Sequence, residues 1–310
     1  MAKNRFKFLL FLSILTVSCN DNIPKYSKKR PSFKEVIGTH FIEVKRTFDS
    51  GLVFNKEGFQ LYPERQFYIL SEDSMKTWSP ERKKYFKFKI FFDHDSVFNM
   101  HEEFVRFKRI TKDSIVIQLL EVTLMKISNT RSNIYMTFYS GDYLKKRSLN
   151  VEKLRKPSRR DTMFILTKAD KANRKPDSVE SSFPATVPVV LMPKADWITV
   201  EKPIVKNENS GDEDYSDGFL YPTYNISIKK AYKDFNYSFS ALIDFKGNLT
   251  FVEPESEILP EFKEAQIKIM KGIVDVYLRR LLTITPGKTL NIAHGSLIVL
   301  NVRGRGKSKK

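Results

Sequence analysis

Short segments in which apolar and polar residues alternate occupy the first half of this chain, and this period of two limits its fold more than any other feature. Phe86, Phe88 and Ile90, for example, alternate with lysines, as expected for a strand with one face in water. Several such segments with turn residues between them, and almost no helical period, predict an antiparallel β sandwich or barrel over residues 33–143. The predicted strands include 39–45, 86–90, 104–110, 115–119 and 133–139.

The pattern at residues 107–117 consists of an alternating segment, the turn 111–114 and a second apolar segment. It resembles the repeating hairpins of lipocalin-like domains, which occur in many bacterial lipoproteins. That resemblance implies a cup for a small apolar ligand. A barrel filled by its own side chains fits the same pattern, because alternation specifies a sheet and not a cavity. The sequence leaves both interpretations open.

Residues 219–303 show a different order of elements, namely a hairpin, a helix, a Pro-Gly-Lys turn and a last strand. Gly247 lies in the hairpin turn, where glycine easily takes a positive φ. Pro260 opens the helix, whose first turn is acidic. The predicted elements are strands at 239–245, 249–254 and 296–302 and a helix with the apolar face Phe262, Ala265, Ile269, Ile273 and Val276.

This order resembles the C-terminal domain of TonB proteins. The resemblance rests on the helix, on Pro286-Gly287-Lys288 and on the turn residues Asp244, Lys246, Gly247 and Asn248. It implies a small α+β domain in which a short sheet packs on one helix. It also implies binding of an extended segment of an outer-membrane receptor by addition of a strand to the sheet edge. The fold class expected for the whole chain is therefore α+β.

The chain departs from TonB proteins in ways that affect function. TonB itself has an inner-membrane helix and a long Pro-rich spacer, whereas the 14 prolines of this chain are dispersed. The aromatic residue that often precedes the family's proline is absent, and Leu282, Ile284 and Thr285 occupy that region. The resemblance therefore implies docking to a partner and not energy transduction from the inner membrane.

Residues 144–218 predict a charged connector with possible short strands. Basic residues crowd its first part, and the apolar segment 162–166 is expected as an isolated strand within it. A second strand-like segment lies at 197–200, and the acidic segment 207–217 is expected to be a flexible loop.

The N-terminus has a basic start, an apolar stretch at 8–17 and the only cysteine of the chain, Cys19. This pattern is typical of a secretory signal peptide, and the apolar stretch is too short to span a bilayer. Residues 15–19 resemble a bacterial lipobox, although Thr16 replaces the usual aliphatic residue. The resemblance implies that 1–18 are removed and that the Cys19 sulfur carries a diacylglyceryl group, with 19–32 as a tether. An ordinary signal peptide with an incidental cysteine is the alternative.

The single cysteine and the charge also limit the partners. Without a second cysteine the chain forms no internal disulfide, so its stability outside the cytoplasm must come from packing. The formal net charge of +18, to which 304–310 contribute as a predicted basic tail, favours anionic partners such as lipid headgroups. Nucleic acid is not expected, because a lipidated chain leaves the cytoplasm.

The four histidines, which are the first candidates for catalysis or metal binding, are His40, His94, His101 and His294. Residues 93–95 and 101–103 form the only cluster of metal-capable side chains, and their spacing fits no known ligand pattern. The chain has no Gly-x-Ser-x-Gly nucleophile motif. We therefore expect no catalytic residue, no metal site and no cofactor.

These features together predict a lipoprotein at the outer membrane of a bacterial envelope, facing the periplasm. It would be a non-enzymatic binding or scaffold protein that docks an envelope protein through residues 219–303. One alternative is a carrier of lipid or a small apolar ligand in the N-terminal β domain. Another is an envelope enzyme with an unrecognised site, which would require His94, His101 and nearby carboxylates to converge in one pocket.

Overall fold

The computed structural model describes residues 30–79, 82–101, 103–203 and 220–306. The predicted signal peptide at 1–18, the proposed lipidation of Cys19 and the acidic segment 207–217 lie outside the described residues.

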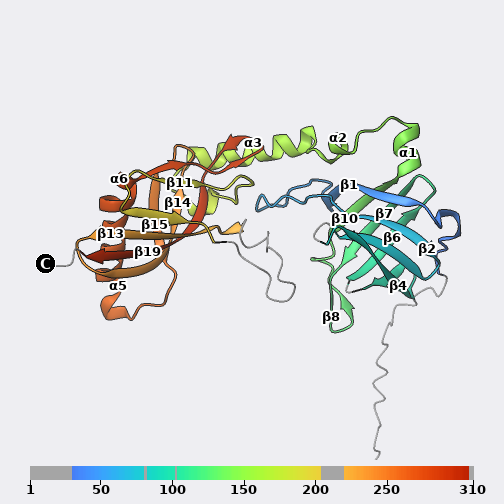
Figure 1. The fold of residues 1–310 in the computed structure, drawn as a ribbon, viewed down its shortest axis with the longest axis horizontal. Coiled ribbons are helices and arrows are strands. Elements are labelled where there is room, and N and C mark those ends of the chain that lie inside the picture. Colours follow the sequence, from blue (N-terminus) through green and yellow to red (C-terminus); the bar gives the residue numbers. More distant parts are fainter. Residues whose placement is uncertain (1–29, 80–81, 102, 204–219, 307–310) are drawn as a thin grey trace, which may run out of the picture.

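The predicted N-terminal β domain is a closed barrel of eight antiparallel strands, not a sandwich (Figure 1). Each strand pairs with its neighbour in sequence, and the last strand closes the ring by pairing with the first. All five strands named from the sequence are present. In ring order the strands are β1 (His40–Phe48), β10 (Ile134–Ser140), β7 (Ser114–Leu120), β6 (Glu103–Ile110), β5 (Val97–Met100), β4 (Lys84–His94), β3 (Ser74–Ser79) and β2 (Gln66–Ser71).

The centre of the barrel is filled by inward-facing side chains. Four of its phenylalanines, Phe33, Phe98, Phe107 and Phe92, pack around one another with ring centroids 5.1–5.5 Å apart. Eight strands enclose an interior just wide enough for side chains to fill, so this packing is the expected geometry. The fully buried core also contains Phe41, Phe67, Phe138, Ile69, Met75, Ile90, Val105, Ile115, Ile117 and Met136.

One end of the barrel is closed by the segment that precedes β1. Phe33 is fully buried, and the short helix η1 (Lys34–Val36) follows it. The Glu72 carboxylate accepts hydrogen bonds from Ser32 Oγ at 2.8 Å and from the Phe33 N–H at 3.1 Å. The last residues of the predicted tether are therefore bound to the barrel.

The other end carries charged side chains that point inward. Glu43 lies opposite the core residue Phe138 and is fully buried. Arg46 donates to both Glu43 oxygens at 2.7 Å, and the Glu43 Oε2 atom also accepts the Arg65 N–H at 3.0 Å. Arg65 in turn binds Glu103 through two hydrogen bonds of 2.5 and 2.7 Å. These pairs fix the residues before β2 against a bulge in β1.

Three helices follow the barrel and correct one sequence prediction. They are α1 (Gly141–Lys146), α2 (Val151–Arg155) and α3 (Arg159–Arg174), so the expected strand at 162–166 is wrong. Ser158 caps α3 in a reciprocal capping box with Asp161, which starts a helix just before the apolar segment. No helix in the described ranges is both long and apolar enough to cross a bilayer.

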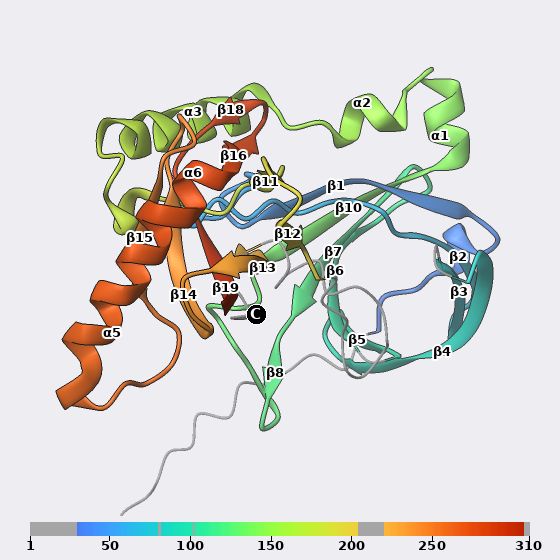
Figure 2. The same cartoon turned by 60° about the vertical axis from the view of Figure 1, so that its left-hand side comes forward.

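The C-terminal part contains a five-stranded sheet with a helix on one face (Figure 2). The turn before β15 has Gly247 at φ +86°, where a Cβ atom would lie 2.5 Å from the Ile284 carbonyl oxygen. Strand β19 lies in the centre, parallel to β13 and antiparallel to β14. In order the strands are β12 (Ile198–Glu201), β13 (Thr223–Ala231), β19 (Ser296–Gly306), β14 (Phe235–Ile243) and β15 (Leu249–Pro254).

The predicted helix is present but buries a different face. It consists of α5 (Pro260–Ile273), the π-helical turn η3 (Val274–Leu278) and α6 (Arg279–Leu281). Of the five residues predicted to face the core, only Ile273 is buried; Ile269 is half-buried and the other three are exposed. The π-helical turn has more residues than an α-helical turn, which rotates Val276 out of the buried face, whereas Phe262 and Ala265 precede this turn and lie on a second apolar side of α5. The buried residues are Met270, Ile273, Val274 and Leu278.

Two further differences concern the connector and the basic tail. Strand β12 and strand β11 (Val190–Pro193) lie in the predicted connector and pair with C-terminal strands, β12 with β13 and β11 with β16 (Leu282–Thr285). Strand β19 continues through Gly306, where a tail was expected from residue 304. The Gly306 N–H donates to Asp234 Oδ1 at 2.7 Å, which holds this extension. The remaining strands are β17 (Lys288–Thr289) and β18 (Ile292–Ala293), and a 3₁₀ turn, η2, spans Val179–Ser181.

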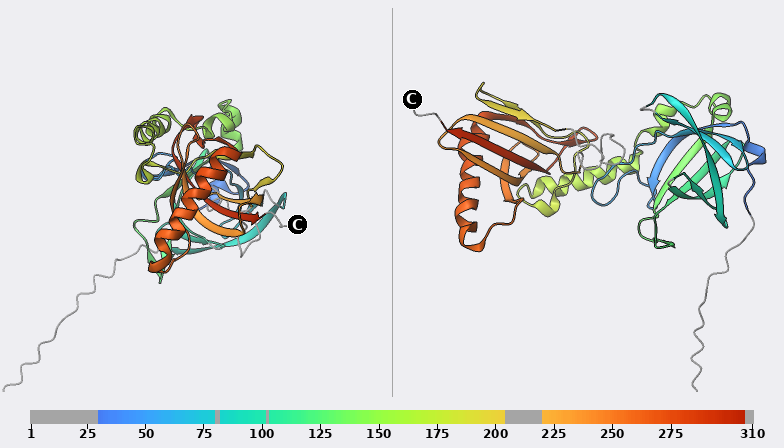
Figure 3. Two further views of the ribbon diagram at one scale, coloured as in Figure 1. Left: turned by 90° about the vertical axis from the view of Figure 1, so that its left-hand side faces the viewer. Right: turned by 60° about the horizontal axis from the view of Figure 1, so that its bottom comes forward.

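Helix α3 connects the barrel with the C-terminal sheet (Figure 3). Its buried residues Ile165 and Ala169 pack with Phe54 from the loop after β1 and with Phe183 from the segment after α3. Gly58 in the same loop has φ +93°, and a Cβ atom there would lie 2.5 Å from the Phe183 ring. This loop therefore sets how closely the segment around Phe183 approaches the barrel.

We expect the substitution Glu43→Leu to lower the free energy of unfolding by about 3 kcal/mol, because it removes the partner of a largely buried Arg46 and leaves backbone N–H groups without an acceptor. Urea denaturation followed by circular dichroism measures this loss. Glu152→Leu is the matched control, since Glu152 is exposed and 3.6 Å from Arg155, and it should change the free energy by less than about 0.5 kcal/mol. Equal losses in the two variants would contradict the prediction.

Candidate functional site

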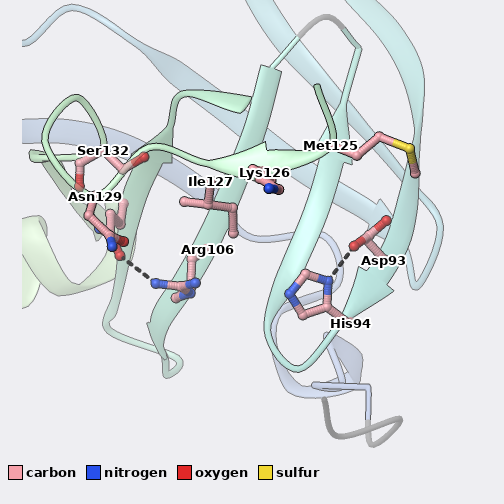
Figure 4. A pocket seen from close by; sticks show the side chains of 9 residues that line it. Asp93, His94, Arg106, Met125, Lys126, Ile127, Asn129 and Ser132 are labelled. Carbon is pink, nitrogen blue, oxygen red and sulfur yellow. Dashed lines mark hydrogen bonds and ion pairs between the residues drawn. The ribbon is translucent and has the colours of Figure 1, made fainter. Parts of the chain in front are cut away.

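A polar hollow lies on the outer wall of the barrel, beneath a two-stranded arm inserted between β7 and β10 (Figure 4). The arm consists of β8 (Val122–Thr123) and β9 (Lys126–Ile127). The pocket has a volume of about 590 Å³. Its lining residues are Asp93, His94, Arg106, Gln118, Met125, Lys126, Ile127, Asn129 and Ser132.

A chain of hydrogen bonds fixes one side of this pocket. Arg106 Nη1 donates to Gln118 Oε1 at 3.2 Å, and Gln118 Nε2 donates to the Ser132 carbonyl at 2.6 Å. Ser132 Oγ accepts the Glu121 N–H at 3.0 Å. These bonds hold the loop that carries the arm against the barrel wall, and Gln118 and Ser132 are buried as a result.

The other side of the pocket carries Asp93, which is hydrogen-bonded to His94 Nδ1. Ser132, the only hydroxyl among the lining residues, lies across the pocket from this pair (Figure 4). A nucleophile and its base must be within hydrogen-bond reach, so these side chains do not form a catalytic pair. With Arg106 and Lys126 the pocket instead offers several hydrogen-bond donors and two permanent cations.

The structure separates the two histidines that an enzyme would have to bring together. His94 ends β4, whereas His101 lies between β5 and β6. The four residues of β5 stand between them, so they occupy opposite ends of the barrel. His101 acts on Glu103 electrostatically: burial alone would raise the pKa of Glu103, but Arg65 and, less strongly, Arg46 and His101 hold it below its usual value. The described residues contain no group of three or more His, Cys, Asp or Glu side chains able to hold a metal ion.

The rings of His40 and His294 stack on aromatic side chains, which indicates that both histidines have structural roles. The His40 ring stacks on Tyr68 at 4.3 Å, and its Nε2 atom is 3.0 Å from Gln66 Oε1. Burial lowers the pKa of His40. His294 is fully buried and stacks on Phe183, with ring centroids 3.6 Å apart.

The hydrogen bonds of His294 fit a neutral ring. Thr289 Oγ1 accepts the Thr186 N–H at 3.2 Å, so its own hydrogen is available for His294 Nε2 at 2.9 Å. Nδ1 is 3.1 Å from the Gly295 carbonyl and is then the protonated nitrogen. Burial, and less strongly the charge of Lys168, lower the pKa of His294 to about 4, although the hydrogen bond to Gly295 acts in the opposite direction. The ring therefore stays neutral in the folded protein near pH 7.

The C-terminal sheet offers an open edge and an open face. In the described part of the chain, β15 pairs only with β14, and no strand occupies its other side. The face away from the helix is polar. Asn225, Asn301 and Ser238 form a row across three strands, with hydrogen bonds of 3.0 and 2.7 Å between neighbours.

The sequence pattern indicates Asp93 and His94 as candidates but not Arg106, Gln118 or Ser132. No local signal marks these three, because each looks like an ordinary residue on the wet face of a strand or in a loop. They meet only where the loop after β7 folds back over the barrel wall.

Comparison of this chain with protein-family models, curated proteins and solved structures found no match. The resemblances to lipoproteins and to the TonB C-terminal domain therefore rest on the residues quoted for them.

The neutral ring of His294 predicts loss of stability in acid. Its pKa lies below the ordinary value of 6.5 in the folded protein, so its stabilising contribution is complete above about pH 7 and falls as the pH drops toward 4. When the pH is lowered from about 7.5 to about 4.5, the free energy of unfolding of both proteins should fall. We expect it to fall by roughly 2 kcal/mol less in the His294→Gln variant than in the unmodified chain. Urea denaturation at both pH values measures this. An identical acid response of the two proteins would contradict the assignment.

Proposed function

We propose that this protein is a lipoprotein held in a bacterial envelope through Cys19, at the outer membrane facing the periplasm. It acts as a non-enzymatic binding or scaffold protein and docks an envelope protein through its C-terminal sheet. The anchor is supported by residues 15–19, which resemble a lipobox.

The observation that carries the docking role is the open edge of β15. The order β14, β15, helix and β19 supports the resemblance to the TonB C-terminal domain, which binds an extended segment by strand addition. Because β19 is already flanked by β13 and β14, an added strand would have to pair at an outer edge of the sheet. Strand β15 has six residues and β12 only four, so β15 gives the longer edge.

The charged side chains at the end of β15 suggest which side chains the added segment carries. Arg279 Nε donates to the outward Leu249 carbonyl at 2.9 Å, which leaves the later residues of the strand for pairing. A hollow of about 390 Å³ follows, lined by Glu253, Glu255, Glu257 and Lys263 among others. Three carboxylates beside one ammonium group favour an extended segment with a basic side chain.

Two other functions receive less support. A carrier of lipid or a small apolar ligand needs an open interior, whereas phenylalanine and aliphatic side chains occupy the centre of the barrel. An envelope enzyme with an unrecognised site needs its histidines and carboxylates in one pocket, whereas His94 and His101 lie at opposite ends of β5.

The anchor makes a direct prediction. Cells that express the full chain and are fed an alkyne fatty acid should label it, and Cys19→Ala should abolish the label, because the chain has no other cysteine. Lys3→Ala is the control for expression and should keep the label. Equal labelling of the Cys19→Ala chain would contradict the anchor.

The docking edge predicts a position-dependent cross-link. A benzophenone amino acid at Thr250 or Val252 should form an adduct of one and the same mass in intact cells, since a paired strand lies about 4.8 Å away. The matched control is Thr199 on β12, the opposite edge, which should give no such adduct. Adducts at Thr199 but not on β15, or no adduct at any of the three positions, would contradict docking at this edge.

A further inference from the structure

The β8–β9 arm extends away from the barrel and ends in two large apolar residues (Figures 1 and 2). Leu124 is 91% exposed and Met125 is 98% exposed, the highest values among the large apolar residues that the structure describes. Exposed apolar residues are common singly, but two adjacent ones at the tip of a projecting hairpin form a concentrated apolar surface. Packing within the folded chain does not account for them.

The backbone conformation at this tip also disfavours large apolar residues. Leu124 has φ +50° and Met125 has φ +60°, the left-handed region at both central positions of the turn. Turns of this kind strongly favour Asn-Gly or Asp-Gly, because residues with a large side chain are strained there. The arm therefore carries apolar side chains at two positions where both solvation and backbone geometry disfavour them.

Exposed aromatic and basic side chains continue along the strand that passes beneath the arm. Asp93 lines the pocket beneath the arm together with Met125, and on the same face of β4 the exposed residues Phe91, Lys89 and Lys87 precede it. Phe91 is 60% exposed. Lys126 follows Met125 directly and adds a further cation.

Two acidic groups near the arm have partners. Asp93 is hydrogen-bonded to His94, and Glu121 lies 3.5 Å from Arg131. Exposed apolar side chains next to lysines match the boundary between the acyl chains and the anionic headgroups of a bilayer.

The proposed anchor places the arm near such a surface. Eleven peptide units separate Cys19 from Arg30, the first described residue, and span at most about 38 Å when fully extended. A barrel on so short a tether stays close to the bilayer, so even a weak second contact would be occupied.

We propose that the β8–β9 arm is a second membrane contact, in which Leu124 and Met125 insert into the interfacial layer of an anionic bilayer and Lys126, Lys87 and Lys89 lie against its headgroups. The inference rests on the proposed lipid anchor for its place at the membrane. Contact at two points would restrict the orientation of the barrel, which a single tether leaves free.

The test uses the chain from residue 20 onward, which lacks the signal peptide and the lipid, so its outcome is independent of lipidation at Cys19. Its sedimentation with vesicles of phosphatidylethanolamine and phosphatidylglycerol is compared with that of the double variant Leu124→Asn, Met125→Gly. This variant removes the apolar tip and supplies the preferred turn sequence, so its thermal midpoint should be unchanged or higher. We expect its partition coefficient to be at least about tenfold lower.

Leu259→Asn is the matched control, because Leu259 is 63% exposed and lies directly before α5, in the C-terminal part of the chain. It should bind vesicles as the unmodified chain does. Unchanged binding of the double variant, or equal losses in the double variant and the control, would overturn the proposal. Failure of the unmodified chain to bind these vesicles would overturn it too.

Insertion of the arm's tip into the bilayer can also be measured by fluorescence. The chain from residue 20 has no cysteine, so Leu124→Cys supplies a single site for an environment-sensitive fluorophore. Its emission should rise on addition of the anionic vesicles, whereas the same label at Leu259→Cys should not respond. A label at position 124 that stays in water while the protein is bound would show that surface charge alone holds it, which contradicts insertion of the tip.

Discussion

The arrangement of the barrel depends on the hydrogen bonds and the ion pair that the buried carboxylate of Glu43 forms. It binds the guanidinium of Arg46 and the N–H of Arg65, and its own backbone carbonyl accepts Arg155 Nε of α2 at 3.0 Å. The residue thus joins the barrel wall, the segment before β2 and the helices that lead to the C-terminal sheet. An isolated charge at this depth would be very costly, so the carboxylate and its donors must be assembled together.

Because the barrel interior is filled, the proposed binding role would depend on the outer surfaces of the molecule. Phenylalanine and aliphatic side chains fill the interior, and the two ends are closed by the segment before β1 and by ion pairs. What remains for recognition are surfaces: the arm and its pocket on one side, and the edge and polar face of the C-terminal sheet on the other. A rigid scaffold with binding residues on its loops is a common solution.

The sequence predicted strands well and helices poorly, for identifiable reasons. Alternation along β4 and β6 survives in the structure because each of these strands buries mainly one face. Residues 162–166 look like a strand, since threonine, phenylalanine and isoleucine favour sheets, but the capping box at Ser158 and packing against Phe54 make them helical. The face of α5 was misjudged because the helix has apolar residues on two sides. The pocket was missed because only the fold brings Arg106 and Ser132 near the arm.

The central position of β19 has a consequence for the order of folding during synthesis. The barrel is complete once residue 140 has emerged, because its last strand pairs with its first. The C-terminal sheet cannot form in its final order until residues 296–306 arrive and insert between β13 and β14. Until then both of those strands present open edges, the state in which strands pair most readily with other chains. The two parts of the molecule thus mature at different times, and the later one is exposed to mispairing for longer.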